Sequence, residues 1–405
     1  MTQSFSFLSQ LKTKGFMPIF LGIFLSFFAK GHAVLSLSVL LLVLFSFLFI
    51  SKNKEIAKRD FIYLGLMLFY LWIVFSGFWS QDTFYFFQKM NLKSALIAVA
   101  FSFFWIPNIS IKHLERTTQF ILCIFIVSTF LVGYMYLQNQ VLFSQNIMKG
   151  QALWVPLRSH IRYGLLLNFC FLLSLFFSYY YHTSHLLKSK IYAALAIYFL
   201  LFIHFLSVRS AILSLYVSLL CFGVFWILKT RKYIQGTFVA LGLVLIFYSM
   251  VLTIPTLSKK VGYMRWDIQE FLANPAHQYS DGSRWHSIQI GQQIFKQHVL
   301  LGVGEGDMKQ AISSYTGIEK GEETMLPHNE FVYIMAANGI VGLCLFLMVL
   351  FYSIWYAWLN KLWLPFAYTA SMVAAFMVEP MLETQLGVLV FVLPFCLFYK
   401  IDYHS

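Results

Sequence analysis

Apolar runs of about 20 residues recur along most of this chain, with short polar segments between them. A helix of roughly 20 consecutive apolar residues crosses the hydrocarbon core of a bilayer. The pattern therefore predicts an all-α, polytopic membrane protein with about twelve transmembrane helices. The predicted spans lie near residues 16–30, 33–50, 61–79, 93–109, 118–137, 162–181, 190–207, 210–228, 234–254, 329–357, 362–379 and 384–400.

One polar stretch, residues 255–327, is far longer than the others. It predicts three regions: about nine spans in 1–254, a large loop in 255–327, and about three spans in 328–405. The loop mixes acids, bases and turn residues, so we expect it to contain helices. Asp281-Gly282-Ser283 is typical of a cap, and Gly302-Val303-Gly304 of a helix stop and turn. Between them, an amphipathic helix is predicted with these residues near one face: Trp285, Ile288, Phe295 and Val299.

The short basic loops predict the orientation, because lysine and arginine concentrate in cytoplasmic loops. With both termini in the cytoplasm, all of these loops fall on one side. Their basic residues are Lys52, Lys54, Lys58, Arg59, Lys112, Arg116, Lys188, Lys190, Lys229, Arg231, Lys232, Lys361 and Lys400. The large loop then lies on the extracytoplasmic side.

The composition agrees with a membrane protein: 60% of the residues are hydrophobic and 11% are charged. Soluble domains have about 25% charged residues. The excess of Lys and Arg (29) over Asp and Glu (16) is explained by topology, so no nucleic-acid partner is predicted. The five cysteines all lie within apolar runs and form neither a disulfide framework nor a metal-binding spacing.

Arginines on the extracytoplasmic side are the first candidates for ligand binding. No Asp or Glu occurs between Glu115 and Asp267, and this stretch contains Arg158, Arg162 and Arg209 at predicted helix ends. The planar guanidinium group suits phosphate, so we expect an anionic ligand. The alternative is that these side chains reach lipid headgroups or pair with carboxylates of the large loop.

Two further cations extend this set. Arg284 lies where the loop helix is expected to begin, and a helix N-terminus favours anions. Pairing with Asp281 is its alternative role. Lys89, in the first extracytoplasmic loop, is the other candidate.

A polar group occurs where the large loop re-enters the membrane, at Leu326-Pro327-His328-Asn329-Glu330-Phe331. Histidine titrates nearest to neutral pH, which suits His328 to proton transfer. Helix capping is the alternative for His328 and also fits Asn329. Acidic residues that could orient an imidazole or an arginine are Glu330, Glu379 and Glu383.

Several other polar residues on this side are weighed for chemistry. His160, His286 and His298 remain possible by position. Glu305 and Asp307 could bind a divalent ion, but two carboxylates are few ligands for such an ion. No metal and no cofactor are predicted.

Together these motifs resemble the O-antigen ligase and polymerase superfamily of bacterial envelope glycosyltransferases. The resemblance rests on Ser283-Arg284-Trp285, the run His298 to Gly304, Pro327-His328-Asn329-Glu330, Asn338-Gly339, Ser207-Val208-Arg209-Ser210 and His160-Ile161-Arg162-Tyr163. It covers the whole layout of spans around one large loop and implies a GT-C-like fold in the bacterial inner membrane, with the active site on the periplasmic face.

The resemblance implies a metal-independent, inverting transfer from a glycan on undecaprenyl diphosphate. In a ligase the acceptor is a sugar hydroxyl of lipid A-core. By resemblance His328 is the general base, and Arg209, Arg284 and Arg162 bind the diphosphate. A single large loop favours the ligase.

Three alternatives remain open. An O-antigen polymerase and a protein O-oligosaccharyltransferase share the layout and differ in acceptor. A transporter of an anionic solute belongs to another class, and transporters characteristically have repeated halves and broken helices around a midplane site.

Overall fold

The computed structural model describes residues 15–29, 32–51, 54–148, 152–273, 280–317 and 325–403, and helices dominate it. Residues 1–14, predicted to be cytoplasmic, lie outside these ranges. The five cysteines are unpaired, in agreement with the sequence. The all-α prediction is confirmed; in the described ranges the β-structure is one parallel pair, β1 (Ile109–Ser110) with β2 (Ile401–Asp402).

Seven helical segments within the described ranges are long and apolar enough to cross a membrane. They are α4 (Asp60–Phe75) with η2 (Ser76–Phe78), α7 (Ile111–Gln138), α9 (His160–Tyr180), α10 (Leu186–Leu206), α11 (Arg209–Thr230), α12 (Tyr233–Thr253) and α16 (Glu330–Leu359). Each coincides with a predicted span, because its apolar run is long enough to form about five helical turns.

Shorter helices occupy the other predicted spans: α2 (Phe16–Ser26), α3 (His32–Ser46) with η1 (Phe47–Phe49), α6 (Ala95–Trp105), α17 (Trp363–Phe376) and α18 (Gln385–Lys400). An 11-residue helix such as α6 rises only about 16 Å. The count of twelve spans therefore stays a prediction. All residues of α18 except Leu386 are buried, so its apolar composition reflects a place at the centre of the bundle.

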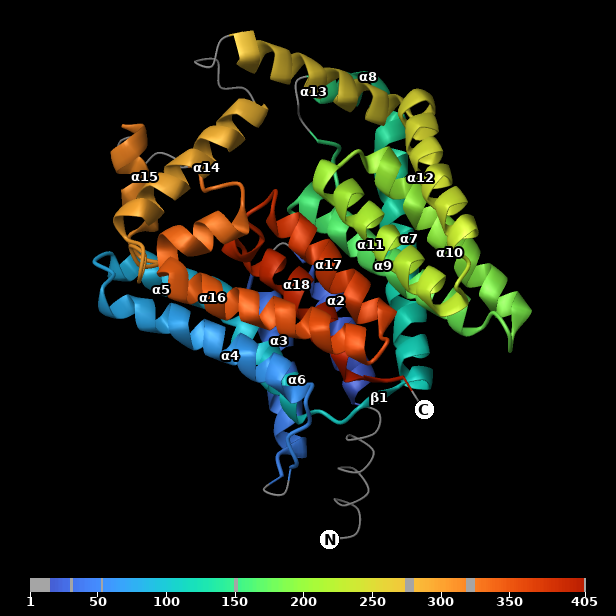
Figure 1. Cartoon of the computed structure of the whole chain (residues 1–405), viewed down its shortest axis with the longest axis horizontal. Coiled ribbons are helices and arrows are strands. Elements are labelled where there is room, and N and C mark those ends of the chain that lie inside the picture. The colour runs from blue at the N-terminus through green and yellow to red at the C-terminus, as the bar shows by residue number, and fades with distance from the viewer. Residues whose placement is uncertain are drawn as a thin grey trace.

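The large loop forms helices, as expected: α13 (Pro255–Ala273), α14 (Ser280–Gln297) and α15 (Met308–Thr316). Figure 1 shows them gathered at one end of the helical bundle, at the top of the view. The remaining helices are α5 (Thr83–Lys93), α8 (Gln140–Met148) and the short turn η3 (Met381–Glu383).

Two details of α14 differ from the prediction. The helix begins at Ser280, so the expected cap residues 281–283 belong to its first turn. Its buried face is also different: Ile290 and Ile294 are 4% and 1% exposed, whereas Trp285 and Val299 are 55% and 46% exposed. The reason is that α14 packs through Ile290 and Ile294 into a small core with α15 and α16.

Five of the described basic residues that were predicted to be cytoplasmic have neighbours outside the loop helices, whereas Lys52 lies outside the described ranges. Lys229, Arg231 and Lys361 line one cavity together. Lys54 and Lys400 both donate hydrogen bonds to the carbonyl of Phe104, close to the β1–β2 pair at the bottom of Figure 1. The orientation of the bundle in a membrane stays a prediction.

Helix α16 is interrupted at Gly339, whose φ of 66° and ψ of −169° are not helical. The turn after α14 fits against this break. Val303 and Gly304 donate backbone hydrogen bonds to the carbonyls of Ala336 and Ala337, and Ile340 donates to Val299, at 2.8–3.0 Å. A Cβ on Gly339 would collide with the Leu300 carbonyl, and one on Gly302 (φ +72°) with the Ala337 carbonyl. Two of the glycine motifs seen in the sequence therefore meet in one backbone joint.

Replacing Gly339 with Ala is expected to destabilise the fold by at least about 1–3 kcal/mol, because only glycine tolerates this backbone conformation. Thermal unfolding of the purified protein in detergent measures this loss. Gly223→Ala is the matched control: a Cβ there meets no atom within 4 Å. Within a helix that change is neutral or stabilises by up to about 1 kcal/mol. Equal stability of the two variants would contradict the requirement for glycine at position 339, where residues 299–304 bond residues 336–340.

Candidate active site

A cavity of about 520 Å³ lies between the loop helices and the ends of α9 to α11, and we call it the arginine cavity. Its polar lining is Arg158, His160, Ser207, Arg209, Ser210, Lys260, Arg284 and Glu379. Its apolar lining includes Leu153, Trp154, Val155, Leu157, Leu206 and Val208. Among the lining residues described, four basic side chains face one carboxylate, which suits the cavity to an anion with an apolar part.

Local backbone structure strengthens the positive potential of the arginine cavity. Arg209 is the first residue of α11, and His160 is the first residue of α9, so two helix N-termini line the same space. Ser207 ends α10 in the left-handed conformation (φ 55°), and its hydroxyl bonds Thr256 of α13 at 3.1 Å. This tight turn lets α11 start beside the cavity, where its free N–H groups and dipole favour negative charge.

A second cavity of about 400 Å³ adjoins the first and contains His328; we call it the histidine cavity. The two share Arg209, Ser210, Arg284 and Glu379 as a common wall. The remaining lining of the histidine cavity is Leu213, Trp285, Ile288, His328, Met377 and Val378. The structure thus brings Arg158, Arg209, Arg284 and His328 to two adjoining cavities.

Glu379 links the imidazole to the guanidinium. Its Oε1 accepts a hydrogen bond from Arg284 at 3.3 Å, and its Oε2 lies 3.5 Å from His328 Nδ1, a distance suited to charge pairing more than to a hydrogen bond. Burial raises the pKa of Glu379, but His328, Arg284 and Arg162 outweigh it and hold that pKa below its ordinary value. The carboxylate is therefore ionised and can orient both partners.

The segment carrying His328 and the turn carrying Glu379 are held by several hydrogen bonds. The backbone N–H of His328 donates to Ser287 of α14 at 3.1 Å. Asn329 caps α16 by accepting from Val332 at 3.1 Å, as its sequence position suggested, and it donates to the Met377 carbonyl at 3.0 Å. Arg162 does not line either cavity; its guanidinium donates to the Pro380 carbonyl at 3.2 Å and so supports the turn.

Glu379→Gln is expected to destabilise the protein in a pH-dependent way. A carboxyl whose native pKa is depressed stabilises the fold fully above its unfolded pKa, about 4.3, and loses this effect as the pH falls through the native value. The stability difference from wild type should be largest near neutral pH and shrink in acid, as measured by thermal unfolding across pH. The exposed Glu55→Gln is the control, with a small difference at every pH. If the stability difference between Glu379→Gln and wild type were the same at every pH, Glu379 would not act as an ionised partner of Arg284 and His328.

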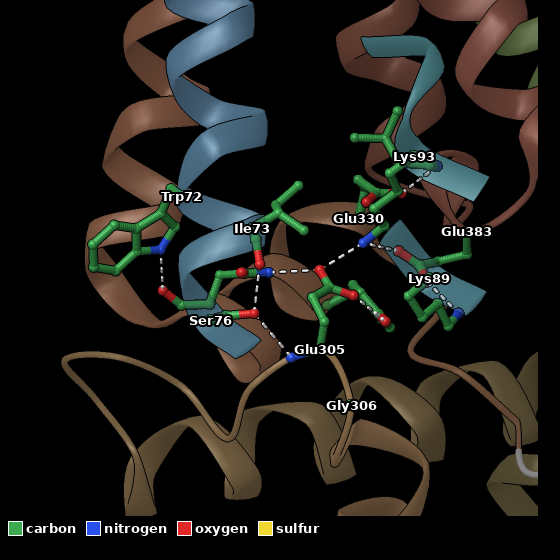
Figure 2. Close-up of polar contacts among 12 residues, drawn as sticks. Trp72, Ile73, Ser76, Lys89, Lys93, Glu305, Gly306, Glu330 and Glu383 are labelled. Atoms are coloured by element: carbon green, nitrogen blue, oxygen red, sulfur yellow. Dashed lines mark hydrogen bonds and ion pairs between the residues drawn. The ribbon is translucent and has the colours of Figure 1, made fainter. Parts of the chain in front are cut away.

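Behind the cavities lies a buried ionic cluster, drawn in Figure 2: Lys89, Lys93, Glu305, Glu330 and Glu383. Lys93 Nζ lies 2.6 Å from Glu305 and 2.7 Å from Glu383, with its side chain 1% exposed. Glu305 also accepts from Asn338 at 2.8 Å and from Tyr333 at 3.0 Å. Ion pairs and hydrogen bonds therefore connect the turn after α14 with the helices α5 and α16 and with η3.

This cluster contains three residues that the sequence assigned to the site: Lys89 as a ligand-binding cation, and Glu330 and Glu383 as supporting acids. Lys89 lies 2.5 Å from Glu383 and lines neither cavity, because its ammonium is satisfied inside the protein. Burial raises the pKa of Glu383, but Lys89 and Lys93 more than compensate and lower it. Glu330 accepts from the backbone N–H of Leu382 at 2.8 Å, which fixes η3 just beyond Glu379.

Lys93→Met should destabilise the protein by about 3–5 kcal/mol, because it leaves two buried carboxylates without their shared cation. Denaturant or thermal unfolding in detergent measures the change. Lys188→Met is the matched control: Lys188 also pairs with a glutamate, but its side chain is 48% exposed. Such a pair contributes about 0–1 kcal/mol. Similar losses in both variants would show that the cluster contributes no more than a surface pair.

Sequence reasoning overlooked some residues that the fold brings to the cavities. Lys260 and Trp154 line the arginine cavity, yet neither stood out because the chain has many lysines and aromatic residues. Glu305 and Asp307, considered as metal ligands, are used otherwise: Glu305 pairs with Lys93, and Asp307 accepts from the backbone of Gln81 and Asp82.

Comparison with known families supports the resemblance seen in the motifs. Residues 193–347 match the model of a family described as O-antigen ligase. This range includes Arg209, Arg284 and His328. No curated protein matches the chain. The family match confirms the predicted resemblance to the O-antigen ligase and polymerase superfamily.

Proposed function

We propose that this protein is an O-antigen ligase that transfers a glycan from undecaprenyl diphosphate to a sugar hydroxyl of lipid A-core. The family match supports a membrane glycosyltransferase using lipid-linked glycans. The observation that carries the proposal is the common wall, where Arg209, Arg284 and Glu379 lie between a cationic cavity and His328.

In the proposed reaction His328 takes the proton of the acceptor hydroxyl. The freed oxygen attacks the anomeric carbon, the bond from that carbon to the diphosphate oxygen breaks, and the configuration inverts. A sugar hydroxyl is a poor nucleophile, so a base within hydrogen-bond reach contributes about 10²–10⁴-fold. Glu379 stabilises the imidazolium that forms, since its carboxylate lies 3.5 Å from Nδ1.

The leaving group is an undecaprenyl diphosphate, and the cations of the arginine cavity stabilise its charge. Arg209 and Arg284 belong to the common wall, next to the bond that breaks. Preorganised donors are most effective where negative charge develops in the transition state. No metal has a role in this mechanism, because the guanidinium groups supply the charge.

We place this chemistry at the periplasmic face of the bacterial inner membrane. Both cavities lie at the N-terminal end of α11, at Arg209, whereas Lys229 and Arg231 lie at its other end and line a separate cavity with Lys361. The positive-inside rule assigns those three residues to the cytoplasm. Both termini are then cytoplasmic.

His328→Ala is expected to lower the rate of transfer at least about 100-fold. The assay mixes purified protein in detergent with undecaprenyl-diphosphate-linked glycan and rough lipopolysaccharide, with and without EDTA, and follows the shifted product on a gel. His298→Ala, an exposed histidine outside both cavities, is the control and should keep wild-type activity.

Other outcomes of the same assay separate the alternatives. Elongation of the lipid-linked glycan, without lipopolysaccharide product, would replace the ligase with a polymerase. Product lost only with EDTA would contradict a metal-independent mechanism. Normal activity of His328→Ala would remove His328 as the base.

A further inference from the structure

The two cavities differ in their linings outside the common wall. The arginine cavity adds Arg158 and Lys260 together with an apolar strip that includes Trp154. The histidine cavity adds His328, apolar side chains and Trp285, and no further lysine or arginine. Two adjoining spaces with unequal charge are suited to two different ligands.

The proposed function places the diphosphate of the donor beside the arginines and the acceptor hydroxyl beside His328. We infer that the linings outside the common wall select the two substrates: Lys260 and Trp154 of the arginine cavity are determinants of donor binding, and Trp285 of the histidine cavity is the platform for the acceptor sugar. This inference rests on the proposed function and deepens it.

The charge of the arginine cavity indicates that this cavity binds the donor. A diphosphate carries negative charge that must be balanced. The described lining of the arginine cavity contains one acidic residue, Glu379, and four basic residues: Arg158, Arg209, Lys260 and Arg284. Beside them, Leu153, Val155 and Leu157 are buried apolar residues of the segment before α9. The indole of Trp154, 42% exposed, borders the same space. Charged and apolar walls together match a phosphorylated lipid.

The position of the proposed base, His328, indicates that the acceptor binds in the histidine cavity. His328 lines the histidine cavity and not the arginine cavity, so the hydroxyl that it deprotonates must enter the histidine cavity. Trp285 lines this cavity and is 55% exposed, although it lies on a helix packed against the bundle. An exposed indole presents a broad apolar face with a polar N–H edge, which suits the C–H face and hydroxyls of a sugar ring.

The stereochemistry requires the two substrates to approach from opposite sides. In an inverting displacement, the attacking oxygen and the departing diphosphate oxygen lie on either side of the anomeric carbon. The common wall of Arg209, Ser210, Arg284 and Glu379 is where the two cavities meet. An anomeric carbon held there has His328 on one side and the additional cations Arg158 and Lys260 on the other.

The test compares two tryptophan variants in steady-state transfer assays in which donor and acceptor concentrations are varied separately. Trp285→Ala should raise KM for rough lipopolysaccharide about tenfold and leave KM for the lipid-linked glycan within about twofold. Trp154→Ala should show the reverse pattern. Trp285→Phe, which keeps an aromatic face, should restore most of the acceptor affinity. Thermal unfolding of each variant separates binding defects from misfolding.

A pair of neighbouring lysines gives an independent control on the donor side. Lys260→Gln should raise KM for the lipid-linked glycan several-fold, increasingly at low ionic strength, because it removes one of four cations. Lys259→Gln changes the same charge one residue away, outside the lining of both cavities, and should leave both KM values unchanged.

The outcomes distinguish this inference from the proposed function. Transfer by the wild type, with Trp285→Ala raising the donor KM or leaving both KM values unchanged, would overturn the assignment of cavities alone. An equal effect of Lys259→Gln and Lys260→Gln would overturn the role of Lys260. Absence of transfer by the wild type would overturn the proposed function and the assignment together.

Discussion

The shared cation of the buried cluster is the constraint on which the site depends. Lys93 on α5 holds Glu305, which follows α14, and Glu383, which follows α17. An ammonium group taken from water is stabilised only where its partners lie at contact distance. The pairing therefore sets the position of the large loop relative to the turn before α18. Because His328 and Glu379 belong to the ends of those same segments, the cluster fixes the geometry of residues it does not contact.

Glu379 contacts both the proposed diphosphate-binding arginine, Arg284, and the proposed base, His328. Arg284 and His328 come from a loop helix and from the start of α16, and one side chain contacts both. A buried carboxylate with these partners stays charged, as the direction of its pKa shift indicates. The two cavities thus share a charged wall. In the proposed reaction, a substrate that changes the electrostatics of this wall also affects the binding of the other substrate.

Sequence reasoning predicted the features that depend on local pattern and missed those that depend on the packing of distant segments. Apolar runs located the helices, and the capping role of Asn329 followed from its position before α16. The buried face of α14 that was predicted from hydrophobic periodicity is wrong, because the helix packs into a core formed with α15 and α16. Lys89 and Glu383 are 294 residues apart, so their pairing has no local signal. Arg158, Arg209, Arg284 and His328, which the sequence singled out, line the two cavities. Lys260 was not singled out, since only the fold brings α13 to the arginine cavity.

The joint between residues 299–304 and 336–340 has a consequence for how this protein can vary. Its hydrogen bonds connect main-chain groups, which are the same in every residue. Apart from Asn338, whose side chain bonds Glu305, side chains on both segments can therefore be exchanged without loss of these hydrogen bonds while the glycines are kept. A one-residue insertion in either segment would move each donor past its acceptor. The joint tolerates changes of residue identity much better than changes of segment length.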